Sequence, residues 1–326
     1  MKSHMNIPIF IPHQGCPNDC IFCNQRKISG CSTAPTEAEV RHVIQTHLSA
    51  TNHPRNCEIA FFGGSFTGLS LSEQEKYLSI AEEFVKEGSV FGIRLSTRPD
   101  YINSKVLELL AKYSVKAIEL GIQSLDGEVL KESRRFYSIE TALNACRLVK
   151  AYGFSLGVQT MLGLPGDTLE KSLFTARTLI VQKPDMVRIY PTLVIRETDL
   201  ENLYKSGQYR PLALDEAVSW CAEIVPLYEA AGIRILRLGL HQSEDIKAGA
   251  EVVAGPVHPA FGELVYSEIW RRKIAQQLDQ MPEAGKSLII HVSAPEVSRV
   301  IGLNRRNINF FRQAYGFTSI KVVGDR

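Results

Sequence analysis

Short apolar or β-branched runs alternate with longer amphipathic helical patterns along most of this chain. A repeated strand, helix, strand order predicts βαβ units around a parallel sheet. The clearest helical patterns cover residues 72–87 and 139–152. The predicted strands cover residues 7–11, 58–62, 91–96, 117–122, 154–161 and 186–190. This number of strands predicts an α/β fold built on a partial (β/α)6 TIM-like barrel.

The remaining part of the chain predicts a C-terminal α/β extension. No repeat, low-complexity tract or charge block marks a sharp domain boundary. We expect a partial barrel over residues 5–200, and an extension over 201–326 that covers the barrel and shapes the substrate pocket. The elements predicted after the sixth strand are helices at 215–231 and 263–278 and strands at 233–240 and 319–323.

Composition and charge argue against some classes of protein. The 326 residues are 44% hydrophobic, and 37 Lys and Arg nearly balance 35 Asp and Glu. Because no global basic field results, we do not expect nucleic acid as a partner. No apolar run reaches the roughly 18 residues of a membrane span, so we expect no membrane partner. The four cysteines Cys31, Cys57, Cys146 and Cys221 show no disulfide-like pattern, which predicts a reducing, cytoplasmic location.

Three cysteines, Cys16, Cys20 and Cys23, stand close together in the spacing CxxxCxxC. A 4Fe-4S cluster that serves only electron transfer takes four thiolates, so three leave one iron open for another ligand. Cys31 and His13 are nearby candidates for a fourth ligand, but neither continues the compact spacing. A tetrahedral zinc site and three unliganded thiols are the alternatives. We favour the open 4Fe-4S cluster, because zinc ligands usually come as paired CxxC units.

The cysteine spacing, with the aromatic Phe22 before the third cysteine, resembles the signature of the radical S-adenosylmethionine (SAM) enzymes. The resemblance implies that the open iron binds the amino and carboxylate groups of SAM, with Phe22 among the cofactor contacts. It implies reductive cleavage of SAM to a 5'-deoxyadenosyl radical that takes a hydrogen atom from the substrate. It also implies an electron donor such as flavodoxin or ferredoxin.

A glycine-rich segment follows the second predicted strand, at the edge of the sheet where barrel active sites lie. Residues 62–68 resemble the family's Gly-Gly-Glu segment, which holds the SAM ammonium, with Ser65 in place of the glutamate. The resemblance makes Gly63, Gly64 and Ser65 cofactor contacts, and we place Thr67 at the substrate. The structural alternative is an ordinary strand-to-helix turn that needs glycines.

The ends of the third and fourth strands supply further contacts by the same resemblance. Ser96 and Thr97 are expected at the ribose or methionine part of SAM. Residues 119–124 resemble the ELGxQS segment of the Elongator catalytic subunit and coproporphyrinogen dehydrogenase branches. Glu119 and Gln123 point to the same face of a strand. We expect Gln123 to contact the cofactor. A carboxylate in a barrel lumen must be paired, so we expect Glu119 to bind the substrate and to act in catalysis.

Later segments complete the cofactor site that the resemblance implies. Arg135 is the candidate for the SAM carboxylate, although a Phe-Tyr pair replaces the family's Gly-His after it. Residues 161–168 resemble the adenine-binding turn, and we expect Gln159 and Leu164 to contact the cofactor there. Tyr190, at the end of the sixth strand, is expected to line the adenosine or substrate pocket and to act in catalysis.

The extension offers polar residues that we assign to the substrate: Arg237, His241, His258 and Glu263. We also give His258 a catalytic role. A lone histidine more often has a structural function, and an acidic residue in the first turn of a helix often only complements the helix dipole.

The segment IPIFIPHQGCPNDCIFC and the chain length resemble the small clostridial-type queuine lyases of an Elongator-like, stand-alone branch. This resemblance implies cleavage of a carbon–nitrogen bond in queuine, releasing the aminomethyl deazaguanine preQ1 for salvage, and hence a small-molecule substrate. Two alternatives belong to other classes. One is a tRNA-modifying radical SAM enzyme of the Elongator type, which predicts a basic rim around the barrel mouth. The other is a non-catalytic Fe-S or zinc-binding module, which predicts no SAM cleavage.

Overall fold

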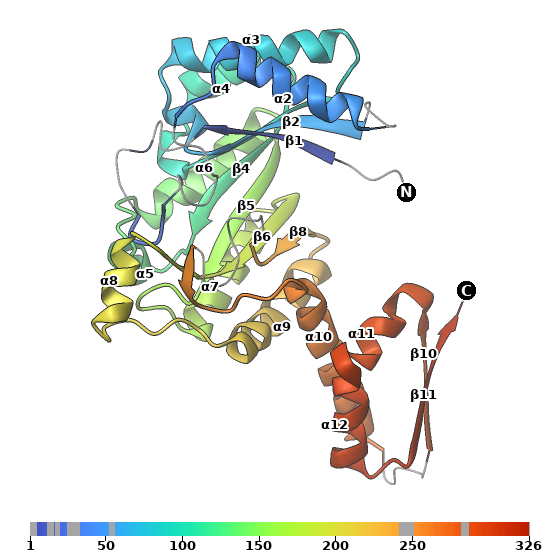
Figure 1. The fold of residues 1–326 in the computed structure, drawn as a ribbon. Helices are drawn as coiled ribbons and strands as arrows, with labels where there is room; N and C mark the ends of the chain where they lie inside the picture. Colours follow the sequence, from blue (N-terminus) through green and yellow to red (C-terminus); the bar gives the residue numbers. More distant parts are fainter. Residues whose placement is uncertain are drawn as a thin grey trace.

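A parallel sheet of seven strands organises the chain in the computed structural model (Figure 1). The structure describes residues 5–11, 16, 20–24, 33–51, 56–240, 251–281 and 287–325. The strands of the sheet are β1 (Met5–Ile11), β2 (Cys57–Gly63), β3 (Gly92–Thr97), β4 (Val115–Gln123), β5 (Ser155–Leu162), β6 (Met186–Pro191) and β8 (Arg234–Leu238). They follow this order across the sheet, and each neighbouring pair is parallel.

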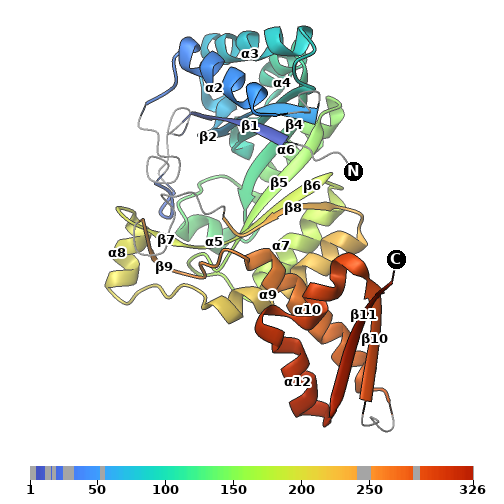
Figure 2. The same ribbon diagram turned by 45° about the vertical axis from the view of Figure 1, so that its right-hand side comes forward.

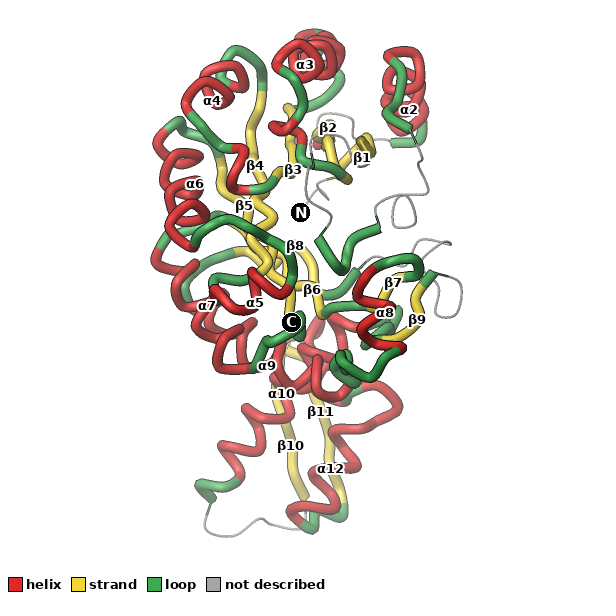
Figure 3. The backbone as a smooth tube through the Cα atoms, turned by 90° about the vertical axis from the view of Figure 1, so that its left-hand side faces the viewer, coloured by secondary structure: helices red, strands yellow, loops and turns green. Residues whose placement is uncertain are grey.

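Helices connect successive strands, and the longer of them lie along the outer side of the curled sheet (Figure 3). The connecting helices are α2 (Glu37–Ser49), α3 (Leu71–Lys86), α4 (Ser104–Leu110), α5 (Gly127–Glu132), α6 (Ile139–Ala151), α7 (Leu169–Val181), α8 (Asp199–Lys205) and α9 (Leu214–Ala230). Short 3-10 turns follow β2 (η2, Phe66–Gly68) and β3 (η3, Pro99–Tyr101). Capping boxes at Thr36 and Ser70 satisfy backbone N–H groups where α2 and α3 begin.

The prediction of an α/β partial barrel is confirmed, and the sheet holds one strand more than the predicted (β/α)6 core. The strand expected at 233–240 is β8, which pairs with β6 from Met186↔Arg234 to Ile189↔Leu238. Residues beyond 200 therefore contribute to the sheet itself. The proposed division into a barrel over 5–200 and a covering extension over 201–326 stays a prediction.

The main hydrophobic core lies between the sheet and its helices. Ile118 and Leu120 of β4 are fully buried in it, together with Leu107 and Val149 of the covering helices. Glu119 stands between the two β4 core residues and points to the opposite face, because side chains alternate along a strand. The core thus fixes which strand residues face the barrel lumen.

The last part of the chain forms a smaller α/β unit below α9 (Figure 2). Its parallel strands β10 and β11 form a separate two-stranded sheet, and β10 was not predicted. A second hydrophobic core is formed by Ile274, Leu278, Val292, Val300, Phe311 and Phe317. The elements of this region are α10 (Phe261–Leu278), β10 (Ser287–Ser293), η4 (Ala294–Glu296), α11 (Val297–Ile301), η5 (Leu303–Arg305), α12 (Arg306–Tyr315) and β11 (Ser319–Asp325).

A short antiparallel pair, β7 (Val194–Ile195) and β9 (Val252–Ala254), lies beside α8. None of the described helices combines the length and the apolar composition that crossing a bilayer requires. The cytoplasmic location stays a prediction.

Candidate active site at the carboxyl ends of the strands

The cysteine segment lies against the carboxyl ends of the first strands. The Sγ of Cys16 lies 3.3 Å from the Oγ of Ser65, directly after β2. A tight turn brings the N–H of Cys23 within 2.9 Å of the carbonyl of Cys20. His13 and Cys31 lie outside the described residues. Within the described ranges, no three His, Cys, Asp or Glu side chains form a group that could hold a metal ion.

Two arginines donate hydrogen bonds to the Sγ of Cys20. Nη1 of Arg135 lies 3.1 Å from this sulfur, and Nη1 of Arg98 lies 3.6 Å from it. Arg98 is held from its other side by an ion pair to Asp100 at 2.8 Å. Cationic donors stabilise a thiolate and tune the cluster that it binds. The surroundings of Cys20 therefore fit an iron–sulfur ligand.

Tyr137 completes this arrangement and was not predicted. Its ring centroid lies 5.1 Å from Cζ of Arg135 and 5.5 Å from Cζ of Arg98. Its hydroxyl donates to the carbonyl of Ile122 at 2.6 Å. Burial raises the pKa of Tyr137, so the ring stays neutral between two cations. The one sequence feature that pointed to Tyr137 was the Phe-Tyr pair after Arg135, which replaces the Gly-His of the resembled family.

Arg135, the candidate for the SAM carboxylate, is enclosed by groups of the protein. It is buried, its Nε bonds to the hydroxyl of Tyr137 at 3.0 Å, and its Nη2 donates to the carbonyl of Gly121 at the end of β4. Three of its donors are thus directed to the protein. Its predicted contact with the SAM carboxylate stays a prediction.

The glycine-rich segment after β2 approaches the backbone of β1. Gly63 has a φ of +100°, and a Cβ there would lie 3.3 Å from the backbone nitrogen of Ile11. The N–H of Gly64 donates to the carbonyl of Ile11 at 2.8 Å. The predicted substrate residue Thr67 and the predicted cofactor residue Thr97 bond through their hydroxyls at 2.7 Å. The segment is therefore a fixed turn linked to the end of β3.

Gln123 ends β4 in a strained conformation. Its φ is +68°, which is uncommon for a residue other than glycine, and the register of β4 shifts beside it. Its buried Oε1 has no hydrogen-bond partner within the described structure. A buried polar atom without a partner is costly unless a ligand satisfies it. This atom fits the cofactor contact that was predicted for Gln123.

A network of buried charges lies deeper in the barrel, around Glu119. Glu119 is 1% exposed, and its carboxylate accepts from Arg94 at 3.0 Å and from Arg188 at 2.6 Å. Arg94 also pairs with Glu58 at 2.8 Å. Burial by itself would raise the pKa of Glu119, but Arg188 and Arg94 outweigh it and lower the pKa. The carboxylate is therefore ionised and neutralised inside the protein.

Other predicted contacts surround this network. Gln159 donates from Nε2 to Glu119 at 3.3 Å. Tyr190 lies beside Arg188 and the predicted substrate residue Arg237, and burial raises its pKa. Ser96 stands opposite Glu119 in the pairing of β3 with β4. These polar groups come from β3, β4, β5, β6 and β8, and the fold brings them together.

Phe22 and Leu164 are packed in apolar surroundings. Phe22 contacts a cluster that contains Ile21, Val194, Leu200 and Tyr209. Leu164 is buried in the turn after β5. In that turn the hydroxyl of Tyr209 donates to the carbonyl of Gly163 at 2.6 Å. Their cofactor contacts stay predictions.

The predicted residues of the extension have structural contacts of their own. Nδ1 of His258 accepts the N–H of Ala260 at 3.1 Å, just before α10 begins. Glu263 forms an ion pair with Arg299 at 3.0 Å and is 56% exposed at its side chain. The structure does not bring these two residues into contact with the network around Glu119. His241 lies outside the described residues.

Family profiles match most of the chain. The Radical SAM superfamily matches residues 10–179, and the Radical_SAM C-terminal domain matches residues 184–271. The chain belongs to the radical SAM superfamily. It uses a 4Fe-4S cluster and SAM, as its sequence predicted, and Cys16, Cys20 and Cys23 are the residues that would hold the cluster. When bound, these groups supply a 5'-deoxyadenosyl radical.

The chain is also similar to curated proteins of the Elongator type. It is 27% identical over 277 residues to the tRNA uridine(34) acetyltransferase of Methanocaldococcus jannaschii, covering 78% of this chain and 50% of that protein. It is 28% identical to the protein of the same name from Methanocaldococcus infernus, covering 73% of this chain and 47% of that protein. The chain thus spans about half the length of the curated relatives it matches.

A solved structure of the archaeal Elp3 of Methanocaldococcus infernus has the same fold. It superposes with a TM-score of 0.66 at 22% identity and covers 84% of this chain and 64% of that one. Coproporphyrinogen III oxidase of Escherichia coli superposes with a TM-score of 0.50 at 16% identity, covering 70% of this chain and 53% of that one. Both are similar in fold alone.

These relatives correct the expectation about partners. We expected a small-molecule substrate, queuine, and no nucleic acid. That expectation is wrong, because the similar proteins are named for a uridine of tRNA. The physical reason for the error is that net charge sums over the whole chain and is silent on where basic side chains gather.

Proposed function

We propose that this chain is a radical SAM enzyme that modifies a nucleoside of transfer RNA. The observation that carries the proposal is the similarity to a tRNA uridine(34) acetyltransferase over 78% of this chain. The superfamily matches, over residues 10–179 and 184–271, contain the cysteine segment and the ends of the strands that form the candidate site. The proposal covers abstraction of a hydrogen atom from the nucleoside, and it does not include a lyase reaction on queuine.

The barrel residues support a polar heterocycle as the group that is attacked. A uracil ring presents carbonyl oxygens that accept hydrogen bonds, and the lumen offers donors in Arg237 and the hydroxyl of Tyr190. Glu119 already has its charge neutralised, so it adds no net repulsion toward an RNA backbone nearby. In this proposal Arg98, Arg135 and Tyr137 hold Cys20, while Tyr190 and Arg237 orient the base.

The test measures 5'-deoxyadenosine by mass spectrometry under anaerobic conditions. Reconstituted protein is incubated with SAM and dithionite, and with unmodified tRNA, with queuine, or with no further addition. We expect tRNA to raise the yield of 5'-deoxyadenosine above the background, and a tRNA in which cytidine replaces the wobble uridine to raise it less.

A Cys23→Ala variant is the control for chemistry that does not depend on the cluster. A yield that rises with queuine and not with tRNA would overturn the proposal in favour of a small-molecule substrate. A yield that responds to neither would overturn it as well.

A further inference from the structure

The α/β unit formed by residues 287–325 lies beyond both family matches, which end at residue 271. It has its own core, to which β10, α11, α12 and β11 all contribute. Nothing in the radical chemistry described above uses this unit. We therefore examine which partner the surface of this unit could bind.

Basic residues gather in this part of the chain. Residues 261–326 contain 10 Lys and Arg but 6 Asp and Glu, whereas residues 1–260 contain 27 and 29. Between Glu296 and Asp325 there are five basic residues and no acidic one. The nearly neutral net charge of the chain thus conceals a basic C-terminal unit, and a basic surface favours a polyanionic partner.

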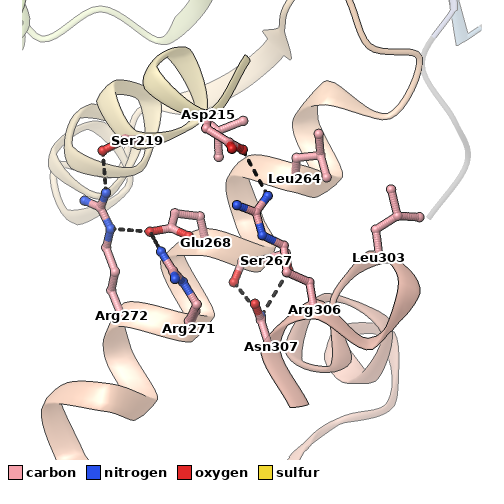
Figure 4. A pocket seen from close by; sticks show the side chains of 11 residues that line it. Asp215, Ser219, Leu264, Ser267, Glu268, Arg271, Arg272, Leu303, Arg306 and Asn307 are labelled. Carbon is pink, nitrogen blue, oxygen red and sulfur yellow. Dashed lines mark hydrogen bonds and ion pairs between the residues drawn. The ribbon is translucent and has the colours of Figure 1, made fainter. Parts of the chain in front are cut away.

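The basic residues at the junction with the barrel are neutralised. A cavity of about 130 Å³ lies between α9, α10 and α12, and Figure 4 shows the charged side chains that line it. Arg306 pairs with Asp215 at 3.0 Å, and Arg271 and Arg272 both pair with Glu268. The ion pairs that line this cavity join the unit to the barrel. Because its arginines are already paired with carboxylates, the cavity is not an anion site.

Other basic side chains of the unit stay unpaired. Arg305, Arg312 and Lys321 are exposed, and the described part of the chain gives them no acidic partner. Arg305 directly precedes α12 as its N-cap and Arg312 lies within the helix, so one short segment carries both basic residues. Asn309 and Gln313 are exposed on α12 as well, and α12 itself contains no Asp or Glu.

The order of elements in the unit also matches a known mode of RNA binding. β10, α11, α12 and β11 follow one another, and residues 302–305 form the loop between the two helices. KH modules use a Gly-X-X-Gly loop between two helices to clamp the backbone of about four nucleotides. Here Gly302 begins the loop with a φ of +76°, and Arg305 stands where the second glycine would be. Leu303 of the loop is 51% exposed, which leaves an apolar contact for a base.

We propose that residues 287–325 form a binding surface for single-stranded RNA, in which Arg305 and Arg312 contact phosphates and Leu303 contacts a base. The choice of RNA rests on the proposed function. The surface, the loop and the charge distribution are independent of it. In this arrangement the unit holds the RNA strand, while the barrel carries out the reaction.

The test uses the full chain and a fluorescein-labelled, single-stranded RNA, with affinity measured by anisotropy at several salt concentrations. The variant is Arg305→Glu combined with Arg312→Glu. The matched control is Lys112→Glu combined with Arg177→Glu, which makes the same change of charge at exposed positions of the barrel. Far-UV circular dichroism and iron content verify that both proteins fold.

We expect the first variant to bind at least tenfold more weakly, and the slope of log affinity against log salt to fall by about 0.7 per lost phosphate contact. The control should keep its affinity within about twofold. Equal losses in the two variants, or no loss in either, would overturn the binding surface.

The outcomes separate this inference from the proposed function. If the first variant loses RNA affinity but tRNA never stimulates SAM cleavage in the unaltered protein, the RNA surface stands and the proposed function fails. If tRNA stimulates SAM cleavage and the first variant binds RNA normally, the proposed function stands and the surface is wrong.

Discussion

Glu119 neutralises two arginines in the interior of the barrel. The carboxylate accepts from Arg94 and Arg188, and all three side chains are largely removed from water. Taking charges out of water is expensive, and the attraction between them offsets that cost only while each keeps its partners. The network is therefore sensitive to the loss of any one member.

The substitution Glu119→Gln should lower the free energy of unfolding by about 3–5 kcal/mol, because it leaves two buried guanidinium groups facing a neutral amide. Urea unfolding at neutral pH measures this. The pKa of Glu119 is lowered, so the difference between the two proteins should shrink as the pH falls below 4.5, the ordinary value for glutamate.

Asp199→Asn is the matched control for Glu119→Gln, because it removes one carboxylate from an exposed pair with Arg134. Such pairs contribute about 0–1 kcal/mol. If Glu119→Gln costs no more than Asp199→Asn, the network does not stabilise the barrel as described.

The substitution Arg135→Gln should make the midpoint potential of the reconstituted cluster more negative. It removes a cationic donor from the Sγ of Cys20, and such donors favour the reduced, more negative cluster. A redox titration monitored by electron paramagnetic resonance reads the potential. Arg134→Gln changes the same charge at an exposed neighbour and should leave the potential unchanged; equal shifts in the two variants would contradict the assignment.

At the scale of elements, the helix pair α11 and α12 depends on one glycine between them. A Cβ on Gly302 would lie 2.9 Å from the Oγ of Ser267 and 3.2 Å from the backbone nitrogen of Asn307. The side chain of Asn307 is buried and donates to the carbonyl of Ser267 at 2.8 Å. This close approach is what fixes α12 against α10.

The substitution Gly302→Ala should loosen the C-terminal unit. Gly316→Ala is the control, because Gly316 has a left-handed backbone, with a φ of +72° and a ψ of 15°, and no atom within 4 Å of its Cβ position. Gly302 differs from it in the close contacts and in a ψ of 156°, which places its backbone in a region essentially limited to glycine. The control should cost only the left-handed conformation, about 1–2 kcal/mol, and Gly302→Ala should cost more. Hydrogen exchange over residues 287–325 reads the difference. Equal exchange in the two variants would show that the close contact is unimportant.

Elements with a clear local pattern could be predicted from the sequence. The six strands and the helix after β2 carry apolar runs or stripes that the core requires, so their positions follow from periodicity. β10 was not predicted, although Leu288, Ile290 and Val292 alternate with exposed residues along it, which is the period-2 pattern of a strand. It is stabilised by β11 and by the second core, which lie far along the chain.

The candidate site divides in the same way. The cysteine spacing and the glycine-rich turn are local, and the sequence displays them directly. The contact of Arg98 and Tyr137 around Cys20 joins segments far apart in the chain, so no spacing rule contains it. Glu119 of β4 likewise meets Arg94 of β3 and Arg188 of β6, and only the order of strands in the sheet brings these residues within reach of each other.

At the scale of the whole molecule, the two hydrophobic cores differ greatly in size. The main core extends through the sheet and its helices, whereas six buried residues form the second. Each core has one of the two tryptophans packed against it: Trp220 contacts the main core and Trp270 the second. The protein therefore contains an internal reporter for each.

The second core should unfold at a lower urea concentration than the main core, because it buries less apolar surface. The measurement compares the fluorescence of Trp220→Phe, which reports on Trp270, with that of Trp270→Phe, which reports on Trp220. Far-UV circular dichroism of both variants verifies that the substitutions leave the fold intact. Coincident transitions would mean that the two cores unfold as one unit.

The seven-stranded sheet does not close on itself: within the described structure, β1 and β8 are the outermost strands and do not pair with each other. A closed barrel admits a reactant only through its end, which limits every dimension of the molecule that enters. An arc of strands limits only the width of the group that reaches Glu119 and Tyr190. A long polymer can then offer a single unit sideways while the rest of its chain stays outside, so the size of the protein places no upper bound on the size of its substrate.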